Sequence, residues 1–309
     1  MGSTTTQINT YYAKANREGL TSEVADLFAD DTPFFAMCQK VSTSSTHPEW
    51  QSDSLNASSK TAIVEGASVT YSQPGTRTRV SNYTQIRLRP FSITFSQLKM
   101  DVAGIKEQYG REVMKAMKSL ALDYESIFLF SGNTAVGDTS TGRSCKGIQR
   151  AITTNTAKGT GSGGTAKVLI TETQVNTILQ KIWNEGGDPR ALFCGGFSKR
   201  VISQKFTAKT GFSWNVNASA RMAIANVNKY EGSFGTLDII PSREHMVRRA
   251  TVVTPEQLKV FVYRDIAQYE GAQTKSAKNG WVEGELSLGW GNQKAHGRIS
   301  WIKHSGTIS

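Results

Sequence analysis

The clearest pattern along the chain is a helical stripe between residues 102 and 130. Apolar side chains recur there every three or four positions, at Ile105, Tyr109, Val113, Met117, Leu120, Tyr124 and Ile127. This spacing places them on one face of a helix. At a rise of ~1.5 Å per residue, about 29 residues span about 43 Å, which exceeds the usual helix of a compact domain. The pattern predicts one unusually long helix.

The segment before this helix, residues 61–98, alternates as an extended chain does. One of its two faces carries Val80, Asn82, Thr84, Ile86 and Leu88. The Pro-Gly pair at Pro74 and Gly75 marks a turn between two extended halves, so we expect a long hairpin. Each arm of about 15 residues, at ~3.3 Å per residue, reaches about 50 Å. Because neither face is apolar enough to line a core, we expect the hairpin to lie on another subunit.

Composition separates the rest of the chain into further parts. Residues 1–60 are rich in Ser and Thr and carry few apolar side chains, which predicts an arm that needs a partner surface to become ordered. Residues 132–167 are rich in Gly, Thr, Ser and Ala, which is typical of a crossing into a second domain.

The second domain has mixed helical and extended patterns. Thr171 and Gln174 have the spacing of a capping box, and an apolar stripe follows them at Val175, Ile178, Leu179, Ile182 and Trp183. A short helix is predicted at 198–206. Strands are predicted at 191–194, around 232–235, and at 247–253, 258–263, 281–290 and 297–303, with a turn at 271–280.

The net charge of +11 is spread along the chain and is not gathered into one stretch. Residues 1–60 have a net charge of −3, whereas residues 61–170 and 171–309 each have +7. There is no long basic run and no stripe of basic and aromatic residues, so a diffuse positive background is favoured over a dedicated DNA-reading surface.

Motifs of catalysis and metal binding are absent from the sequence. The glycines near Gly159 lack the Gly-Lys-Ser/Thr of a phosphate loop, and the four histidines lack metal-ligand spacing. A catalytic triad assembled across distance stays open, although there is no Gly-x-Ser-x-Gly elbow. We expect no catalytic residue, no cofactor and no metal site. Cys38, Cys145 and Cys194 have no paired spacing, so we expect no disulfide. No apolar run predicts a membrane span or a secretory signal.

The order of arm, long hairpin, long helix, mixed domain and returning strands resembles the Hong Kong 97-type major capsid fold. More narrowly, the chain resembles the major capsid proteins of the SU-ten phage family. Short segments in the expected order carry this likeness, and they lie at 31–34 (Asp-Thr-Pro-Phe), 47–55, 64–66, 82–86 (Asn-Tyr-Thr-Gln-Ile), 186–189 (Gly-Gly-Asp-Pro), 196–200, 234–237, 240–241 and 294–297.

The resemblance implies an α+β fold with five parts. They are an N-terminal arm at 1–60, an extended β-hairpin loop at 61–98, a spine helix and peripheral domain at 99–160, an α/β axial domain at 161–262, and return strands of the peripheral domain at 263–309.

The implied function is that of a bacteriophage major capsid protein, a structural protein of the virion and not an enzyme. It would assemble with itself in the host cytoplasm into hexamers and pentamers of an icosahedral shell around double-stranded DNA. Portal, scaffolding or decoration proteins would be further partners, and a membrane would not. Two alternatives stay open. One is an encapsulin-like nanocompartment shell, which only the likeness of the motifs to phage capsid proteins distinguishes from a phage capsid. The other is a nucleic-acid-binding enzyme that uses the basic background.

Candidate inter-subunit contacts are Arg77, Arg79, Arg87, Arg89, Tyr83 and Trp50. The arginines contrast with the acidic arm, so we expect the loop and a neighbouring arm to attract each other, and reversal of Arg87 and Arg89 to Glu to impair assembly. Some relatives of the fold join subunits covalently through a loop lysine. Because residues 61–98 contain no lysine, we expect no such crosslinking.

Overall fold

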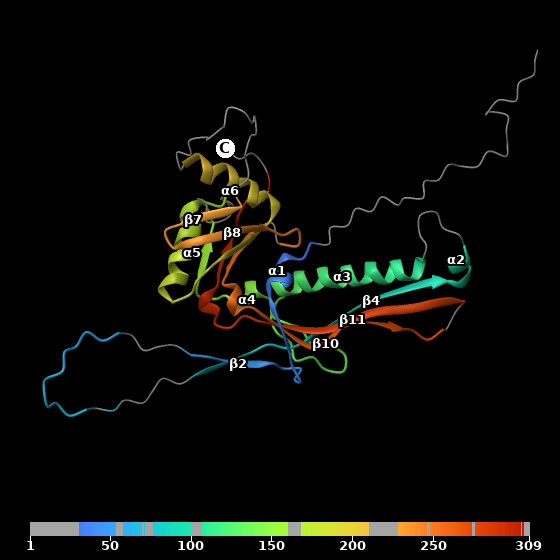
Figure 1. Ribbon diagram of the computed structural model, residues 1–309, viewed down its shortest axis with the longest axis horizontal. Helices are drawn as coiled ribbons and strands as arrows, with labels where there is room; N and C mark the ends of the chain where they lie inside the picture. The colour runs from blue at the N-terminus through green and yellow to red at the C-terminus, as the bar shows by residue number, and fades with distance from the viewer. Residues whose placement is uncertain are drawn as a thin grey trace, which may run out of the picture.

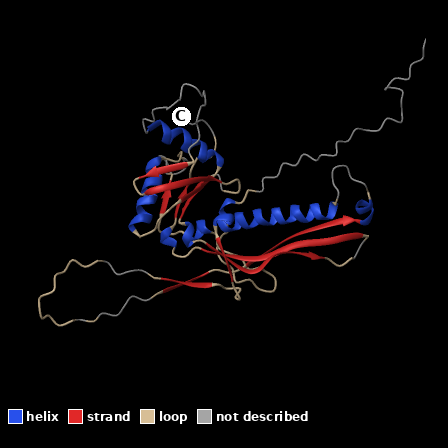
Figure 2. Cartoon of the chain, in the orientation of Figure 1, coloured by secondary structure: helices blue, strands red, loops and turns tan. Residues whose placement is uncertain are grey.

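The computed structural model describes residues 31–53, 58–69, 71, 77–100, 107–159, 168–209, 228–245, 248–273, 276–303 and 305. Two units built on sheets meet near the end of one long helix (Figure 1). A four-stranded sheet runs along the helix, and a six-stranded sheet with two helices forms the second unit (Figure 2). No helix in the described part of the chain is both long and apolar enough to cross a bilayer.

The long helix α3 (Gln108–Phe130) confirms the helix predicted from the apolar stripe, while residues 101–106 lie outside the described part. Its buried face includes Leu120, Tyr124 and Phe128, all without exposed surface. The Tyr124 hydroxyl donates to the carbonyl of Gly284, at 2.6 Å, and to that of Gln85, at 3.2 Å. Burial raises the pKa of this hydroxyl, so it remains a donor. The helix is therefore fixed to the sheet by a polar contact within its apolar interface.

The four-stranded sheet takes its strands from three distant parts of the chain. Their order is β1 (Gln39–Ser42), β10 (Lys259–Glu270), β11 (Ala277–Gly289) and β4 (Gln85–Thr94). β1 pairs parallel with β10, and β11 pairs antiparallel with both β10 and β4. The strands predicted at 258–263 and 281–290 are confirmed and are longer than expected, so the turn between them is shorter than 271–280.

The pairing predicted for residues 61–98 is wrong. β3 (Thr78–Ser81) pairs antiparallel with β2 (Glu49–Ser52) of the arm, and β4 lies in the four-stranded sheet against β11. Residues 58–69 and 71 contain no strand, and the predicted turn at Pro74 and Gly75 lies outside the described residues. Alternation in sequence indicates an extended backbone, but it does not specify which strand supplies the hydrogen-bond partners.

The six-stranded sheet forms the core of the second unit. Its strands run in the order β5 (Thr156–Lys158), β12 (Gly297–Ser300), β9 (Arg249–Val253), β6 (Ala191–Cys194), β8 (Gly235–Pro241) and β7 (Lys229–Gly232). One face packs against α5 (Glu172–Asn184) and α6 (Gly196–Lys209), and the other contributes Ala191, Phe193 and Val253 to the core around α3. The capping box predicted at Thr171 and Gln174 is present.

The C-terminal part of the chain serves both sheets. β10 and β11 belong to the four-stranded sheet, as predicted for the return strands, but β12 pairs with β9 and β5 of the six-stranded sheet. Assignment of all of residues 263–309 to the peripheral domain is therefore wrong. The physical reason lies in Gly297 and Ile299, which pack under α5 together with Ile178.

The remaining short elements sit at the junction of the two units and at the sheet ends. They are α1 (Pro33–Met37), α2 (Phe95–Lys99), α4 (Ile148–Ala151) and two 3₁₀ turns, η1 (Pro255–Gln257) and η2 (Gln293–Ala295). The buried carboxylate of Glu125 on α3 accepts from the amides of Phe34 and Phe35 on α1, at 3.1 and 2.7 Å, and from the Ser242 hydroxyl, at 3.3 Å. Burial raises the pKa of Glu125 even though these bonds oppose the shift. One side chain thus joins the arm, the long helix and the second unit.

We predict that Gly297→Ala lowers the free energy of unfolding by about 1–3 kcal/mol, the usual cost of overpacking a core. The added methyl group would fall against the Ile178 side chain under α5. Chemical denaturation measures the effect. Gly142→Ala is the control, because nothing lies within 4 Å of the position that its added methyl group would take, and it is expected to change stability little. Equal effects of the two substitutions would contradict the docking of β12 under α5.

Candidate assembly surface

Residues 49–81, hereafter the extended loop, consist of β2, β3 and the segment between them. The loop leads away from the body of the molecule (Figure 1). Its tip exposes four large apolar side chains, Ile63, Val64, Val69 and Tyr71, at 85, 78, 72 and 91% of their surface. Apolar side chains grouped on a projecting segment mark a site of protein contact, because their exposure to water is unfavourable.

Two of the predicted contact residues are paired within the extended loop itself. Arg77 contacts Asp53 at 3.2 Å, and Arg79 contacts Glu49 at 3.3 Å, both across the β2–β3 ribbon. All four side chains are well exposed, so each pair contributes little stability. Two of the four predicted arginines thus pair with carboxylates of the arm in their own chain.

Arg87 and Arg89 lie on β4 and not on the extended loop. Both reach Asp123 on α3, Arg87 at 3.4 Å and Arg89 at 2.5 Å, with a second Arg89 bond of 2.8 Å. Only 14% of the Asp123 side chain is exposed, so this pairing ties the strand to the helix. Reversal of both arginines to Glu would therefore disturb the subunit itself, and it cannot isolate a contact between subunits.

The two aromatic candidates anchor the base of the extended loop. The Trp50 ring nitrogen donates to the carbonyl of Gly291 at 2.8 Å, and its ring packs against Trp290 and Phe261. Tyr83 stacks on His47, with ring centroids 4.1 Å apart. All six predicted residues thus have partners in their own chain, and their role between subunits stays a prediction.

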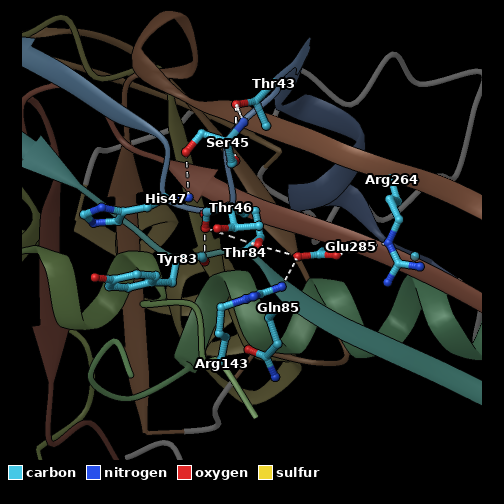
Figure 3. Close-up of polar contacts among 12 residues, drawn as sticks. Thr43, Ser45, Thr46, His47, Tyr83, Thr84, Gln85, Arg143, Arg264 and Glu285 are labelled. Carbon is cyan, nitrogen blue, oxygen red and sulfur yellow. Dashed lines mark hydrogen bonds and ion pairs between the residues drawn. The ribbon is translucent and has the colours of Figure 1, made fainter. Parts of the chain in front are cut away.

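A buried carboxylate, Glu285 on β11, organises the base of the loop (Figure 3). It accepts from the Thr84 hydroxyl at 2.6 Å, from Arg143 at 2.6 Å and from Arg264 at 3.1 Å, and only 2% of its side chain is exposed. Burial alone would raise the pKa of this carboxyl. The bonds from Thr84 and the two arginines outweigh burial, and the pKa is lowered. Glu285 is therefore ionised at neutral pH, although it is buried.

Asn82 fixes the chain next to this network. Its amide nitrogen donates to the carbonyls of Leu288 and Lys146, at 2.7 and 3.1 Å, and its amide oxygen accepts from the Lys146 amide at 2.9 Å. Sequence reasoning missed the roles of both Asn82 and Glu285. A signal for Asn82 was present, because it and Thr84 interrupt the face that Val80, Ile86 and Leu88 share.

The described residues offer little for catalysis. Among them, no three His, Cys, Asp or Glu side chains are grouped so as to hold a metal ion. Burial raises the pKa of Cys145 to about 11 and that of Cys194 to about 12, so neither is a thiolate at neutral pH. Burial lowers the pKa of His296 to about 4, and this ring bonds to the Trp290 carbonyl and the Thr254 amide as a structural group.

Comparison with known proteins identifies both a family and a fold. The model of the family described as SU10 major capsid protein matches residues 2–303. A search of curated proteins finds no match. The capsid asymmetric unit of cyanophage A-1(L) aligns with a TM-score of 0.69 at 10% identity, covering 95% of this chain and 98% of that one. The capsid of a native GTA particle aligns with a TM-score of 0.67 at 8% identity, covering 95% of this chain and 98% of that one.

An encapsulin is also similar, with lower agreement. The holo-SrpI encapsulin complex from Synechococcus elongatus PCC 7942 aligns with a TM-score of 0.55 at 8% identity, covering 92% of this chain and 94% of that one. These likenesses establish the fold, and the predicted Hong Kong 97-type fold is confirmed.

We predict that Glu285→Gln lowers the free energy of unfolding at pH 7 by about 1–3 kcal/mol, because Arg143 and Arg264, whose side chains are 31 and 41% exposed, would then face a neutral group. The folded-state pKa is lowered, so the stability that the carboxylate contributes is present above its ordinary pKa of 4.5 and is lost as pH falls through the folded value. The difference between variant and wild type should therefore shrink in acid. Denaturation from pH 7 down to pH values well below 4.5 measures it, because the loss begins only below the ordinary pKa.

Glu185→Gln provides the control, since Glu185 pairs with Lys294 at 2.8 Å on the surface, where both side chains are 42% exposed. Its effect is expected to stay below about 1 kcal/mol at every pH. A Glu285→Gln effect as small as this, or one that does not depend on pH, would contradict the assignment of Glu285 as the organising charge.

Proposed function

Because this chain belongs to the SU10 major capsid protein family, we propose that it assembles with copies of itself into hexamers and pentamers of an icosahedral shell around double-stranded DNA. The family match covers nearly the whole chain and makes the protein a bacteriophage capsid protein, as the sequence motifs predicted. A capsid protein has a structural role, so the alternative of a nucleic-acid-binding enzyme is set aside.

The extended loop is the observation that carries the assembly proposal. Its base is saturated with contacts to its own subunit, through Trp50, Asn82 and the Glu285 network. Its tip, in contrast, presents Ile63, Val64 and Tyr71 to solvent. A fixed base with an apolar tip favours a segment that buries its tip on a second copy of the chain. We assign this role to residues 49–81 in place of the range 61–98 expected from the sequence.

The enclosed partner and the location follow from the same proposal. The net charge of +11 suits a shell wall facing the phosphates of packaged DNA, which attracts them without reading their sequence. We propose the virion as the site of the assembled protein and the host cytoplasm as the site of assembly, with portal, scaffolding or decoration proteins as further partners. The encapsulin-like alternative shares the fold but would enclose no genome.

The expectation that subunits are not joined covalently has lost its basis. The extended loop includes Lys60, which is exposed and precedes the lysine-free range used for that expectation. The redrawn loop boundaries thus place a lysine close to the apolar tip.

We predict that Ile63→Asp combined with Val64→Asp abolishes shells while the subunit still folds, because two charges would have to be buried at the contact. Negative-stain microscopy and size-exclusion chromatography of the purified chain measure assembly, and circular dichroism measures folding. Nuclease-protected DNA inside wild-type shells would distinguish a phage capsid from a nanocompartment.

The matched control is Ser58→Asp combined with Ser59→Asp, which adds the same two charges to exposed polar positions of the same loop. Shells are expected to form with this variant. Normal shells from the Ile63/Val64 variant would refute the role of the tip, and wild-type protein that forms no particles under any condition would refute the assembly proposal.

A further inference from the structure

Positive side chains gather on one face of the six-stranded sheet near its β5 edge. Ser300 of β12 lies opposite Arg249 of β9, and Arg298 lies opposite Thr251. Residues directly opposite each other on paired strands lie on the same face of a sheet, and so do residues two apart on one strand. Arg249 and Arg298 are therefore diagonal neighbours on one face, with Cα atoms about 7–8 Å apart. The other face, with Val252 and Ile299, is buried under the helices.

The helix α4 adds a third arginine to this face. The Gln149 side chain bonds to the Thr251 hydroxyl, and Arg298 donates to the Gln149 carbonyl at 2.6 Å, so α4 lies directly on these strands. Arg150 follows Gln149, and its Nε donates to the Asn133 side chain at 2.8 Å. We name Arg150, Arg249 and Arg298 the arginine cluster.

The charges of the cluster are not balanced within the described part of the chain, where none of the three arginines forms an ion pair with a carboxylate. Burial lowers the pKa of Arg298, and the charges of Arg249 and Arg150 lower it further, so the nearest charged groups oppose it. The Nε of Arg298 is buried without a hydrogen-bond partner. Arg89 and Arg264, in contrast, each contact a carboxylate.

Such an arrangement is unfavourable for an isolated subunit. Like charges on one sheet face repel each other, and a buried donor without a partner costs free energy. The repulsion between the charges falls if an anion binds between the arginines. Gln149 and Asn133 hold two of the guanidinium groups in place, so an anion would meet donors that are already oriented.

We propose that the arginine cluster binds phosphate groups of the backbone of double-stranded DNA. This inference rests on the proposed function in that DNA is taken to be enclosed. Guanidinium groups match the spacing of phosphate oxygens with two parallel bonds, which makes arginine suited to this anion. Carboxylates at the base of the extended loop already pair with Arg77 and Arg79, which favours phosphate over a neighbouring loop as the occupant.

The test compares DNA binding by the full chain before assembly. We predict that Arg150→Gln combined with Arg249→Gln weakens binding of a short fluorescent DNA duplex about tenfold at low salt, and reduces the slope of log affinity against log salt by about 2. Two duplexes of unrelated sequence should be affected equally, because backbone contacts do not read sequence. Fluorescence anisotropy at several salt concentrations measures both quantities.

Two further variants make the comparison specific. Arg200→Gln combined with Lys259→Gln removes the same charge from exposed positions of α6 and β10, and it should leave the slope nearly unchanged. Arg150→Lys combined with Arg249→Lys keeps the charge and should keep the slope, and it remains usable if the Gln variant does not fold. Equal losses from the cluster and from the control pair would overturn the proposal in favour of diffuse charge.

The outcomes separate this inference from the assembly proposal. A cluster variant that binds DNA normally but no longer forms shells would overturn the inference, because the arginines would then serve a contact between subunits. Wild-type protein that forms no shells would refute the assembly proposal. The DNA-binding test of the arginine cluster would still be valid in that case, because it uses the chain before assembly.

Discussion

Burial of one carboxylate, that of Glu285, constrains the arrangement of the first unit. A buried carboxylate without partners would cost several kcal/mol, so its three donors must arrive together. They come from Thr84 before β4, from Arg143 in the segment after α3 and from Arg264 on β10. This requirement places β4 and β10 on either side of β11, and it sets the point at which the extended loop leaves the body.

The same constraint explains why the extended loop can project. Trp50 and Asn82 add fixed contacts at the base, so the orientation of the extended loop is determined before its tip binds another subunit. A preoriented segment loses less conformational freedom when it binds, which favours assembly of many identical copies. The second unit differs, because its arginine cluster is also held in place by hydrogen bonds, but no carboxylate in the described residues neutralises its charges.

The two units are joined by chain crossings and by polar contacts, among them that of Glu125. β12 returns to the six-stranded sheet after β10 and β11 have completed the four-stranded one. Glu125 links α1, α3 and the segment after β8 at the same junction. The units therefore do not correspond to continuous ranges of sequence, and a substitution at the junction will affect both.

The sequence by itself determined the local elements. The period of apolar residues located α3, the Thr171–Gln174 capping box located α5, and alternation indicated the extended backbone around β3 and β4, because these signals depend on residues close together in sequence. Ordered short motifs also determined the family.

Only the tertiary structure decided which strands pair and which charges meet. β3 lies against the arm, and Arg89 reaches Asp123 across 34 residues of sequence. Such choices depend on the packing of whole faces and on the cost of leaving a buried charge unpaired, and neither quantity is encoded in a single segment.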